Sequence, residues 1–338
     1  MTQDDKNSKN HSIETLRAAA VIMVFMNHLH SLGVLTVPYF GISGGWLGVQ
    51  IFFVISGYLI IQSALRYSGW NYLIHRVLRI YPAYLLWFVV FSVLLGNFSQ
   101  NSLDVKNLLA HLLFLQHFFP DAYLKYDALR VTWTLTVEAV WYVLAFLIAR
   151  RFYNAPSKYV FIFVLLACVW VTGAVGLRIF AGIQDPGQRY FFIQNSAIAQ
   201  MPFFLFGAWI AVTQPRFDKA ALLALVVSTV ALFKAWEPIA VTPIFLTGLG
   251  VSALFLILKD LNYTNPKPIR LLSDVSYSFY LIHYPILMLV MGFVHNKYHR
   301  AFVAFAITVV VSYISYLLVE KPFMNKAKNR KHVVSAGD

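Results

Sequence analysis

Charged residues are scarce in this chain, and acidic residues are the scarcest of them. Of 338 residues only 12% are charged, with 14 Asp and Glu against 27 Lys and Arg. A soluble domain carries roughly twice that charged fraction, whereas 59% of this chain is hydrophobic. The composition therefore excludes an ordinary soluble domain and favours a helical protein that crosses a membrane several times.

Cysteine is almost absent. The single one, Cys168, lies in an apolar run, so the chain forms no intrachain disulfide and no site of cysteine ligands. The histidines are scattered without ligand spacing, and no metal site is expected. The formal net charge of +13 would suit nucleic acid, but basic residues also collect in the cytoplasmic loops of membrane proteins. We therefore expect no nucleic-acid partner.

Ten apolar segments are present, most of them near the roughly 20 residues that span a hydrocarbon core. They lie near residues 14–33, 46–65, 80–96, 133–149, 159–179, 197–213, 220–234, 239–258, 277–294 and 301–319. With the N-terminus in the cytoplasm, 18 of the 27 Lys and Arg fall on the inner side and 8 in outer loops. This bias predicts an all-α, polytopic membrane protein with about ten transmembrane helices and both termini cytoplasmic.

A single transmembrane domain is expected over residues 13–323. An N-terminal cytoplasmic tail precedes it at 1–12, and a basic cytoplasmic tail, suited to anionic lipid, follows at 324–338. The N-terminus lacks the basic start of a cleaved signal peptide. Within the longest loop, roughly 97–132, a leucine-rich stretch at 108–115 predicts a short helix lying on the outer face.

Arg17 and His28 are the most informative pair of residues. Eleven helical steps, about three turns, place both on one face of the first apolar segment, roughly 16 Å apart along its axis. Ionisable groups inside a membrane are costly and usually functional, so His28 is a candidate general base and Arg17 a candidate anion anchor. The alternative is a snorkelling arginine and a hydrogen-bonded packing histidine. Glu14 falls near the same face.

Glu138 lies in the segment Trp133-Thr-Leu-Thr-Val-Glu138, about 7–8 Å below the outer end of its helix. His28 is expected at a comparable depth. A carboxylate beside a histidine fixes its tautomer and stabilises its charged form, which is the role we predict for Glu138. The alternative is a glutamate that faces a water-filled vestibule or pairs with Arg130.

Three further patterns are weaker. Arg76 and Arg79 share one side of a helical turn, which suits a phosphorylated ligand or simply reflects the positive-inside bias. The small residues of the glycine-rich run at 44–57 permit either close helix contact or a local break in the helix that lines a cavity. His283, two residues before Pro285, is either structural or catalytic.

Taken in order, these motifs resemble those of the acyltransferase family 3 membrane enzymes over nearly the whole chain. One departure is Glu14-Thr15, where the family more often has Asp-Gly; the carboxylate is retained. The residues that carry the resemblance are Arg17-x10-His28, Phe52-Phe53-x-x-Ser56-Gly57, Arg76-x-x-Arg79 before Tyr81-Pro82, Trp133 to Glu138, Tyr280-Leu-Ile-His283-Tyr-Pro285, and Val319-Glu320-Lys321-Pro322.

The resemblance implies an O-acyltransferase of the bacterial inner membrane. Its donor would be acetyl-CoA or another acyl-CoA, and its acceptor a hydroxyl of a cell-surface or lipid-linked glycan such as lipopolysaccharide O-antigen or exopolysaccharide. The expected partners are therefore membrane lipid, acyl-CoA and glycan, and self-association is left open. The implied roles are catalysis by His28 and Glu138, donor binding by Arg17, Arg76 and Arg79, and substrate binding by Trp133 and His283.

Two other functions fit the same features. A transporter or flippase shares ten spans, buried charges and proline-broken helices, although many transporters show a repeat between their halves and none is visible here. An acyltransferase of the same fold that acts on a small secondary metabolite is the second alternative.

Overall fold

Helices alone build the part of the chain that the computed structural model describes, namely residues 11–38, 40–67, 69–96, 104–180, 182–234, 242–261 and 263–326. A π-helical turn, η3 (Tyr316–Glu320), continues the last long helix. The long helices are α1 (His11–Ser31), α2 (Phe40–Arg66), α3 (Gly69–Leu94), α7 (Trp133–Asn154), α8 (Pro156–Gly176), α10 (Ala197–Thr213), α11 (Lys219–Lys234), α12 (Thr242–Asp260), α13 (Lys267–Met291) and α14 (Lys297–Ser315). The short ones are α5 (Val105–Leu112), η2 (Gln116–Phe118), α6 (Pro120–Tyr126) and α9 (Pro186–Gln194).

Each of the ten predicted segments overlaps one of the long helices, which confirms an all-helical, multi-pass architecture. Within the described residues, seven helices are long and apolar enough to cross a membrane. Helix α1 is not among them, because Glu14, Arg17 and its histidines lower its hydropathy. The count of ten crossings and the cytoplasmic side of both termini stay predictions. The seven are Leu47–Arg66, Gly69–Leu94, Trp133–Asn154, Pro156–Gly176, Pro186–Thr213, Lys267–Met291 and Lys297–Lys326.

Two helices begin well before their predicted boundaries. Helix α3 starts at Gly69 rather than near residue 80, and α13 starts at Lys267 rather than near 277. Apolar windows mark only the part of a helix that lipid or core can cover, whereas these helices continue over polar residues. Arg76 and Arg79 are consequently inside α3 and not in the connection before it.

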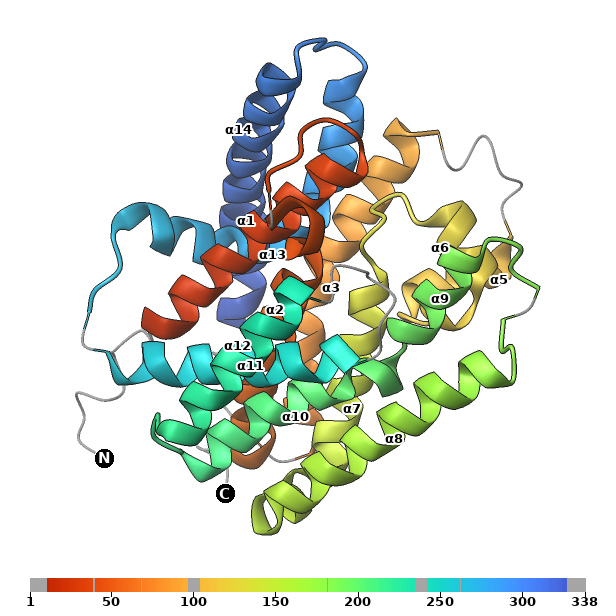
Figure 1. Ribbon diagram of the computed structural model, residues 1–338. Helices are drawn as coiled ribbons and strands as arrows, with labels where there is room; N and C mark the ends of the chain where they lie inside the picture. The colour runs from red at the N-terminus through yellow and green to blue at the C-terminus, as the bar shows by residue number, and fades with distance from the viewer. Residues whose placement is uncertain are drawn as a thin grey trace, which may run out of the picture.

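Helix α1 packs between α2 and α13 in the middle of the molecule (Figure 1). Its first turn is tied to the segment that precedes α13. Thr15 Oγ1 donates to Asn265 Oδ1 at 2.8 Å, and Asn265 Nδ2 donates to Glu14 Oε2 at 3.0 Å. The Glu14 carboxylate is therefore engaged by an amide at this end of α1. These bonds fix the helix that carries Arg17 and His28.

Glycines let α2 approach two neighbouring helices closely. A Cβ on Gly57 would overlap the backbone of Phe204 in α10, and a Cβ on Gly207 would overlap the backbone of Val54 in α2. Gly48 lies similarly close to the backbone of Ala20 in α1. The close helix contact predicted from the glycine-rich run is confirmed at Gly48 and Gly57, and it brings α1, α2 and α10 together around the site.

The short helices α5, α6 and α9 gather at one side of the molecule (Figure 1). Tyr123 of α6 stacks on Phe191 of α9 with ring centroids 5.3 Å apart. The buried Asp127 carboxylate accepts hydrogen bonds from Leu129 N at 3.1 Å, Thr132 N at 3.2 Å and Thr132 Oγ1 at 2.9 Å. This turn sets the start of α7 at Trp133. Helix α5 confirms the short helix predicted at 108–115, although it ends at Leu112.

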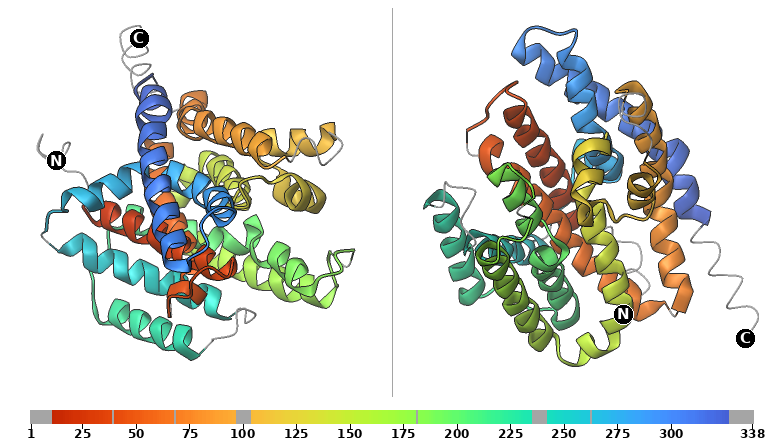
Figure 2. Two further views of the ribbon diagram at one scale, coloured as in Figure 1. Left: turned by 90° about the horizontal axis from the view of Figure 1, so that it is seen from above. Right: turned by 90° about the vertical axis from the view of Figure 1, so that its right-hand side faces the viewer.

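At the C-terminal end of α14, the turn η3 packs against α3, and the blue end of the chain lies beside the orange α3 in both views of Figure 2. The indole of Trp87 donates to Ser315 Oγ at 3.0 Å across this contact. Beyond η3 the helix continues to Lys326. The rest of the predicted basic tail, and residues 1–10 of the predicted N-terminal tail, lie outside the described residues.

Candidate active site

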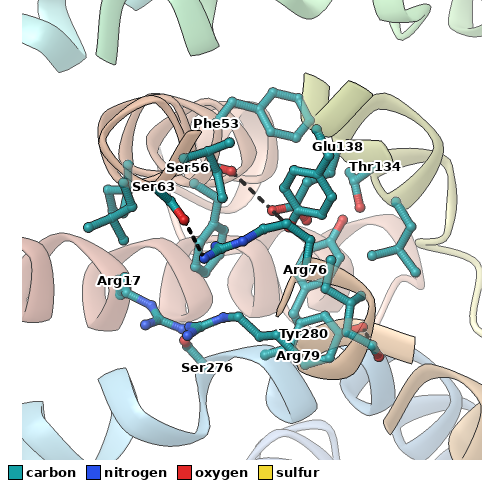
Figure 3. A pocket seen from close by; sticks show the side chains of 18 of the residues that line it. Arg17, Phe53, Ser56, Ser63, Arg76, Arg79, Thr134, Glu138, Ser276 and Tyr280 are labelled. Carbon is teal, nitrogen blue, oxygen red and sulfur yellow. Dashed lines mark hydrogen bonds between the residues drawn. The ribbon is translucent and has the colours of Figure 1, made fainter. Parts of the chain in front are cut away.

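Four arginines line one cavity of about 350 Å³, called here the arginine cavity. Arg66 is exposed at the end of α2, and the other three converge on the space from α1 and α3. Arg17 reaches it from α1, and Arg76 and Arg79 reach it from α3 (Figure 3). Helix α7 contributes Glu138 to the wall, and α2 contributes Ser56. The i, i+3 spacing of the two α3 arginines is what turns both toward the same space.

No carboxylate among the described residues forms an ion pair with any of the three arginines. Arg76 Nη2 donates to Ser63 Oγ at 3.0 Å, while its buried Nε has no hydrogen-bond partner in the described chain. Arg79 acts on Arg17 as a like charge, and Figure 3 shows the two side chains meeting near Ser276. Glu320, Asp274 and Glu138 attract Arg17 from beyond ion-pair distance, so the positive charge of the cluster is only partly balanced. Clustered cations are costly at low dielectric, and the arrangement is suited to a ligand that carries several negative charges.

Glu138 is held by two hydroxyls. Its Oε1 accepts from Ser56 Oγ at 3.1 Å and from Tyr142 OH at 2.6 Å, the latter one turn further along α7. The predicted pairing of Glu138 with His28 is not the arrangement in the structure. The two residues share a membrane depth in the sequence argument, but the side chain of Glu138 turns into the arginine cavity, and His28 has a different partner.

His28 lines a second cavity, of about 570 Å³, called here the amide cavity. Val49 and Tyr280 line both cavities, so the two spaces are adjacent and share this part of their walls. Apart from His28, the side chains that line the amide cavity are uncharged. Its polar lining consists of the amides Asn27, Gln50, Gln194, Asn195 and Gln200, and its aromatic lining of Trp133, Phe191 and Tyr280.

Several of these amides have unused hydrogen-bonding capacity. Gln50 and Gln200 each present a buried Oε1, and Gln194 a buried Nε2, without a partner in the described chain. Gln200 is itself fixed, because its Nε2 donates to the carbonyl of Gln194 at 2.8 Å. An unpaired buried polar atom costs about 1–3 kcal/mol, so these acceptors and this donor are suited to a polar ligand.

The imidazole of His28 contacts a second histidine. Its Nδ1 lies 2.7 Å from Nε2 of His283, and the edge of Tyr284 packs on its ring at 5.1 Å between centroids. His283 is fully buried on α13. It is not among the residues that line the two cavities, so the structure does not give it the contact expected of a substrate-binding residue.

The structure thus divides the predicted site residues between two spaces. Helix α1 carries both Arg17 and His28, as predicted, and each lines a cavity. Arg17, Arg76, Arg79 and Glu138 share the arginine cavity, whereas Trp133 joins His28 in the amide cavity. The sequence argument missed the glutamines. Their signal was available, because a glutamine inside an apolar helix needs a polar partner just as an ionisable residue does.

Comparison with known proteins identifies the family to which the chain belongs. The sequence model of acyltransferase family 3, described as an acyltransferase domain, matches residues 10–319. The chain therefore belongs to this family, which confirms the resemblance carried by the ordered motifs. It is an enzyme, an acyltransferase in a multi-pass helical membrane protein.

Named relatives are similar along most of the chain. The O-acetyl transferase of Shigella phage Sf6 is 26% identical over 94% of this chain and 97% of its own length. The peptidoglycan O-acetyltransferase OatA of Listeria monocytogenes is 28% identical over 92% of this chain, which spans only 55% of OatA. A putative membrane-bound transacylase, BcsY of Komagataeibacter xylinus, is 25% identical over 93% and 83%. No solved structure matches.

Proposed function

We propose that this protein moves an acetyl group from acetyl-CoA, or another acyl group from its acyl-CoA, to a hydroxyl of a cell-surface or lipid-linked glycan in the bacterial inner membrane. One observation carries the proposal. A cavity lined by four arginines, of which Arg17, Arg76 and Arg79 form no ion pair within the described residues, adjoins a second cavity that is lined by a histidine and uncharged amides. The names of the relatives, an O-acetyl transferase and a peptidoglycan O-acetyltransferase, support transfer to oxygen.

The arginine cavity is assigned to the donor. Coenzyme A is an anion with several phosphate oxygens, and guanidinium groups bind phosphate through paired hydrogen bonds. Arg17, Arg76 and Arg79 supply three such groups around one space. Acyl-CoA is made in the cytoplasm, which is the reason for placing the enzyme in the inner membrane with this cavity reached from the cytoplasmic side.

The amide cavity is assigned to the acceptor. A sugar hydroxyl both donates and accepts hydrogen bonds, and the free Oε1 atoms of Gln50 and Gln200 and the free Nε2 of Gln194 complement it. Trp133 and Phe191 offer apolar faces for a sugar ring. The absence of a second charged side chain from this lining favours a neutral acceptor over a phosphate or an amine.

Transfer would take place where the two cavities adjoin. His28 accepts the proton of the acceptor hydroxyl as its oxygen attacks the thioester carbonyl. The carbon–sulfur bond then breaks, the ester forms, and the sulfur of coenzyme A leaves with the proton from His28. Glu138, hydrogen-bonded to Ser56 and Tyr142, lies on the donor side. We therefore assign it to the thioester end of the donor rather than to the orientation of His28.

The proposal is tested with membranes that contain the wild-type protein or His28→Ala at equal abundance. Acetyl-labelled acetyl-CoA is added with an envelope glycan fraction, and the label released by mild base is counted. We expect transfer by the wild type and a loss of at least about 100-fold in the variant, because general base catalysis contributes 10²–10⁴-fold. His30→Ala is the matched control, since His30 lies two residues further on and hydrogen-bonds to Thr36.

Equal transfer by wild type and His28→Ala would remove His28 from the chemistry. Transfer of label to a small soluble molecule but not to glycan would favour the metabolite-modifying alternative. Movement of unmodified glycan across the membrane without ester formation would favour a flippase instead, and would contradict the proposed reaction.

A further inference from the structure

His283 is the buried partner of His28, and its hydrogen bonds define which of its ring nitrogens carries hydrogen. Its Nδ1 lies 2.8 Å from the carbonyl oxygen of Tyr280 and 3.2 Å from that of Phe279. Carbonyl oxygens only accept, so Nδ1 must be the protonated nitrogen. The rings of Phe25 and Phe279 pack around the imidazole, an apolar setting that favours its neutral form.

The tautomer of His283 determines the tautomer of His28. With Nδ1 protonated, Nε2 of a neutral His283 is an acceptor, and it faces Nδ1 of His28 at 2.7 Å. Two unprotonated nitrogens at this distance would repel each other, so Nδ1 of His28 must carry hydrogen and donate. The other ring nitrogen of His28, Nε2, then keeps its lone pair for a proton from the substrate.

The imidazole of His283 is held in place by side-chain packing in addition to its hydrogen bonds. The two imidazoles lie 4.9 Å apart between centroids and are tilted by 33°, and the neighbouring Tyr284 meets the ring of His28 edge-on. His283 is 0% exposed, and α13 packs along α1. The chain Tyr280 carbonyl, His283, His28 is therefore a fixed relay that ends at the wall of the amide cavity.

We infer that His283 is a positioning residue that selects the Nδ1–H tautomer of His28, the role that the sequence assigned to Glu138. This inference rests on the proposed function, since it names the group that prepares the proposed base. His283 differs from a carboxylate partner in carrying no charge. When His28 takes the proton, the lone pair of His283 stabilises the imidazolium through the same hydrogen bond without forming an ion pair.

Three substitutions separate this role from a merely structural one. In His283→Gln the amide oxygen can reach the former Nε2 position and accept from His28. In His283→Asn the shorter amide can still donate to the Tyr280 carbonyl, but it cannot reach His28. His283→Leu removes both bonds. His299→Leu, at an exposed histidine near the start of α14, is the matched control.

The kinetic readout is kcat against KM in the labelled-acetyl assay, at equal abundance in the membrane. We expect His283→Asn and His283→Leu to lower kcat by about 10²–10³-fold with an unchanged KM for acetyl-CoA, because the arginine cavity is not touched. His283→Gln should stay within about tenfold of the wild type. Equal losses for Gln and Asn would indicate a packing role and overturn the inference.

A second readout does not depend on turnover. Protein labelled with nitrogen-15 histidine is reconstituted in lipid, and the ring nitrogens of His28 are assigned by their loss in His28→Ala. We expect Nδ1–H in the wild type and in His283→Gln, and a mixture of tautomers in His283→Asn. Nε2–H in the wild type, or an unchanged tautomer in His283→Asn, would overturn the inference. Failure of wild-type transfer would instead count against the proposed function, and the tautomers would still decide the role of His283.

Discussion

The two cavities share Val49 and Tyr280 in their walls, yet they are built from opposite kinds of polar group. The arginine cavity is lined by four arginines and the carboxylate of Glu138, whereas the amide cavity is lined by one imidazole, several glutamines and asparagines, and aromatic rings. An enzyme that joins a charged donor to a neutral acceptor needs both environments side by side. The proposed function assigns the charged donor to the first cavity and the neutral acceptor to the second.

The largest effect is expected when positive charge is removed from the arginine cavity, which the proposed function assigns to the donor. In the double variant Arg76→Gln with Arg79→Gln we expect KM for acetyl-CoA to rise at least about 100-fold, since a hydrogen bond to a charged group contributes about 1.5–3 kcal/mol. KM for the glycan acceptor should stay unchanged. The measurement is initial rate against each substrate in turn.

Arg151→Gln is the control for this experiment, because Arg151 is an exposed arginine of α7, the helix of Glu138, and lies outside both cavity linings. Equal increases in KM for donor and acceptor would contradict a division of the two substrates between the two cavities.

A substitution at the close contact between α2 and α10 should disturb both cavities, because α2 lines both of them. Gly57→Ala places a Cβ against the backbone of Phe204, so α2 and α10 must separate. Overpacking of this kind costs about 1–3 kcal/mol, and we expect a lower Tm in detergent together with a loss of transfer for any acceptor. In Gly173→Ala the new Cβ meets nothing within 4 Å, so this variant should keep or slightly raise the Tm. A Tm equal to that of the wild type in Gly57→Ala would show that the contact is not tight.

How much of this site is visible in the sequence depends on the cost of each group in an apolar environment. Arg17, His28 and Glu138 stand out because an ionisable residue in an apolar helix is expensive, and depth along a helix follows from residue number. The direction in which each helix faces does not follow from residue number. Glu138 therefore reaches the arginine cavity, and His28 receives His283 from a segment 255 residues away.

The fold, like the site, could be predicted only in part from the apolar pattern of the sequence. Each of the ten apolar segments overlaps a helix within the described residues, but α3 and α13 begin earlier, over polar residues that a hydropathy window excludes. The glutamines of the amide cavity were missed because an uncharged amide lowers the hydropathy of a helix without interrupting it. Their importance appears only when Gln50 on α2, Gln194 on α9 and Gln200 on α10 meet around one space.

Removal of one of these amides tests the assignment of the amide cavity to the acceptor. Gln50 lines the amide cavity, and its buried Oε1 has no hydrogen-bond partner in the described chain. In Gln50→Leu this hydrogen-bond acceptor is lost, and we expect KM for the glycan to rise about tenfold, the value of one hydrogen bond to a neutral group. KM for acetyl-CoA should not change. Gln62→Leu, on the same helix but in the lining of the arginine cavity, is the matched control. A larger effect of Gln50→Leu on the donor than on the acceptor would reverse the assignment of the two cavities.

The smallest expected effect is a pH dependence of acceptor binding, caused by a histidine beside the amide cavity. His117 of η2 lies beside Trp133 and Phe191 of the amide cavity, with ring centroids 6.3 and 5.7 Å away, and burial lowers its pKa from the usual 6.5 to about 4. The unfolded chain therefore binds a proton at a higher pH than the folded one. Stability is full above about pH 6.5 and is lost as the pH falls toward 4, by about 1 kcal/mol between pH 7 and 5.5. His117→Phe keeps an aromatic ring without a titrating group.

We expect the acceptor KM of the wild type to rise more steeply than its acetyl-CoA KM over this range, and the difference to vanish in His117→Phe. Other groups near the cavity also titrate, so the decisive quantity is the wild-type curve minus the variant curve. Equal slopes of acceptor KM against pH in the wild type and in His117→Phe would mean that protonation of His117 does not affect acceptor binding. A steeper rise of the acceptor KM with falling pH in His117→Phe would contradict the sign of the pKa shift. A histidine that is buried in its neutral form can only make the folded protein less stable as the pH falls.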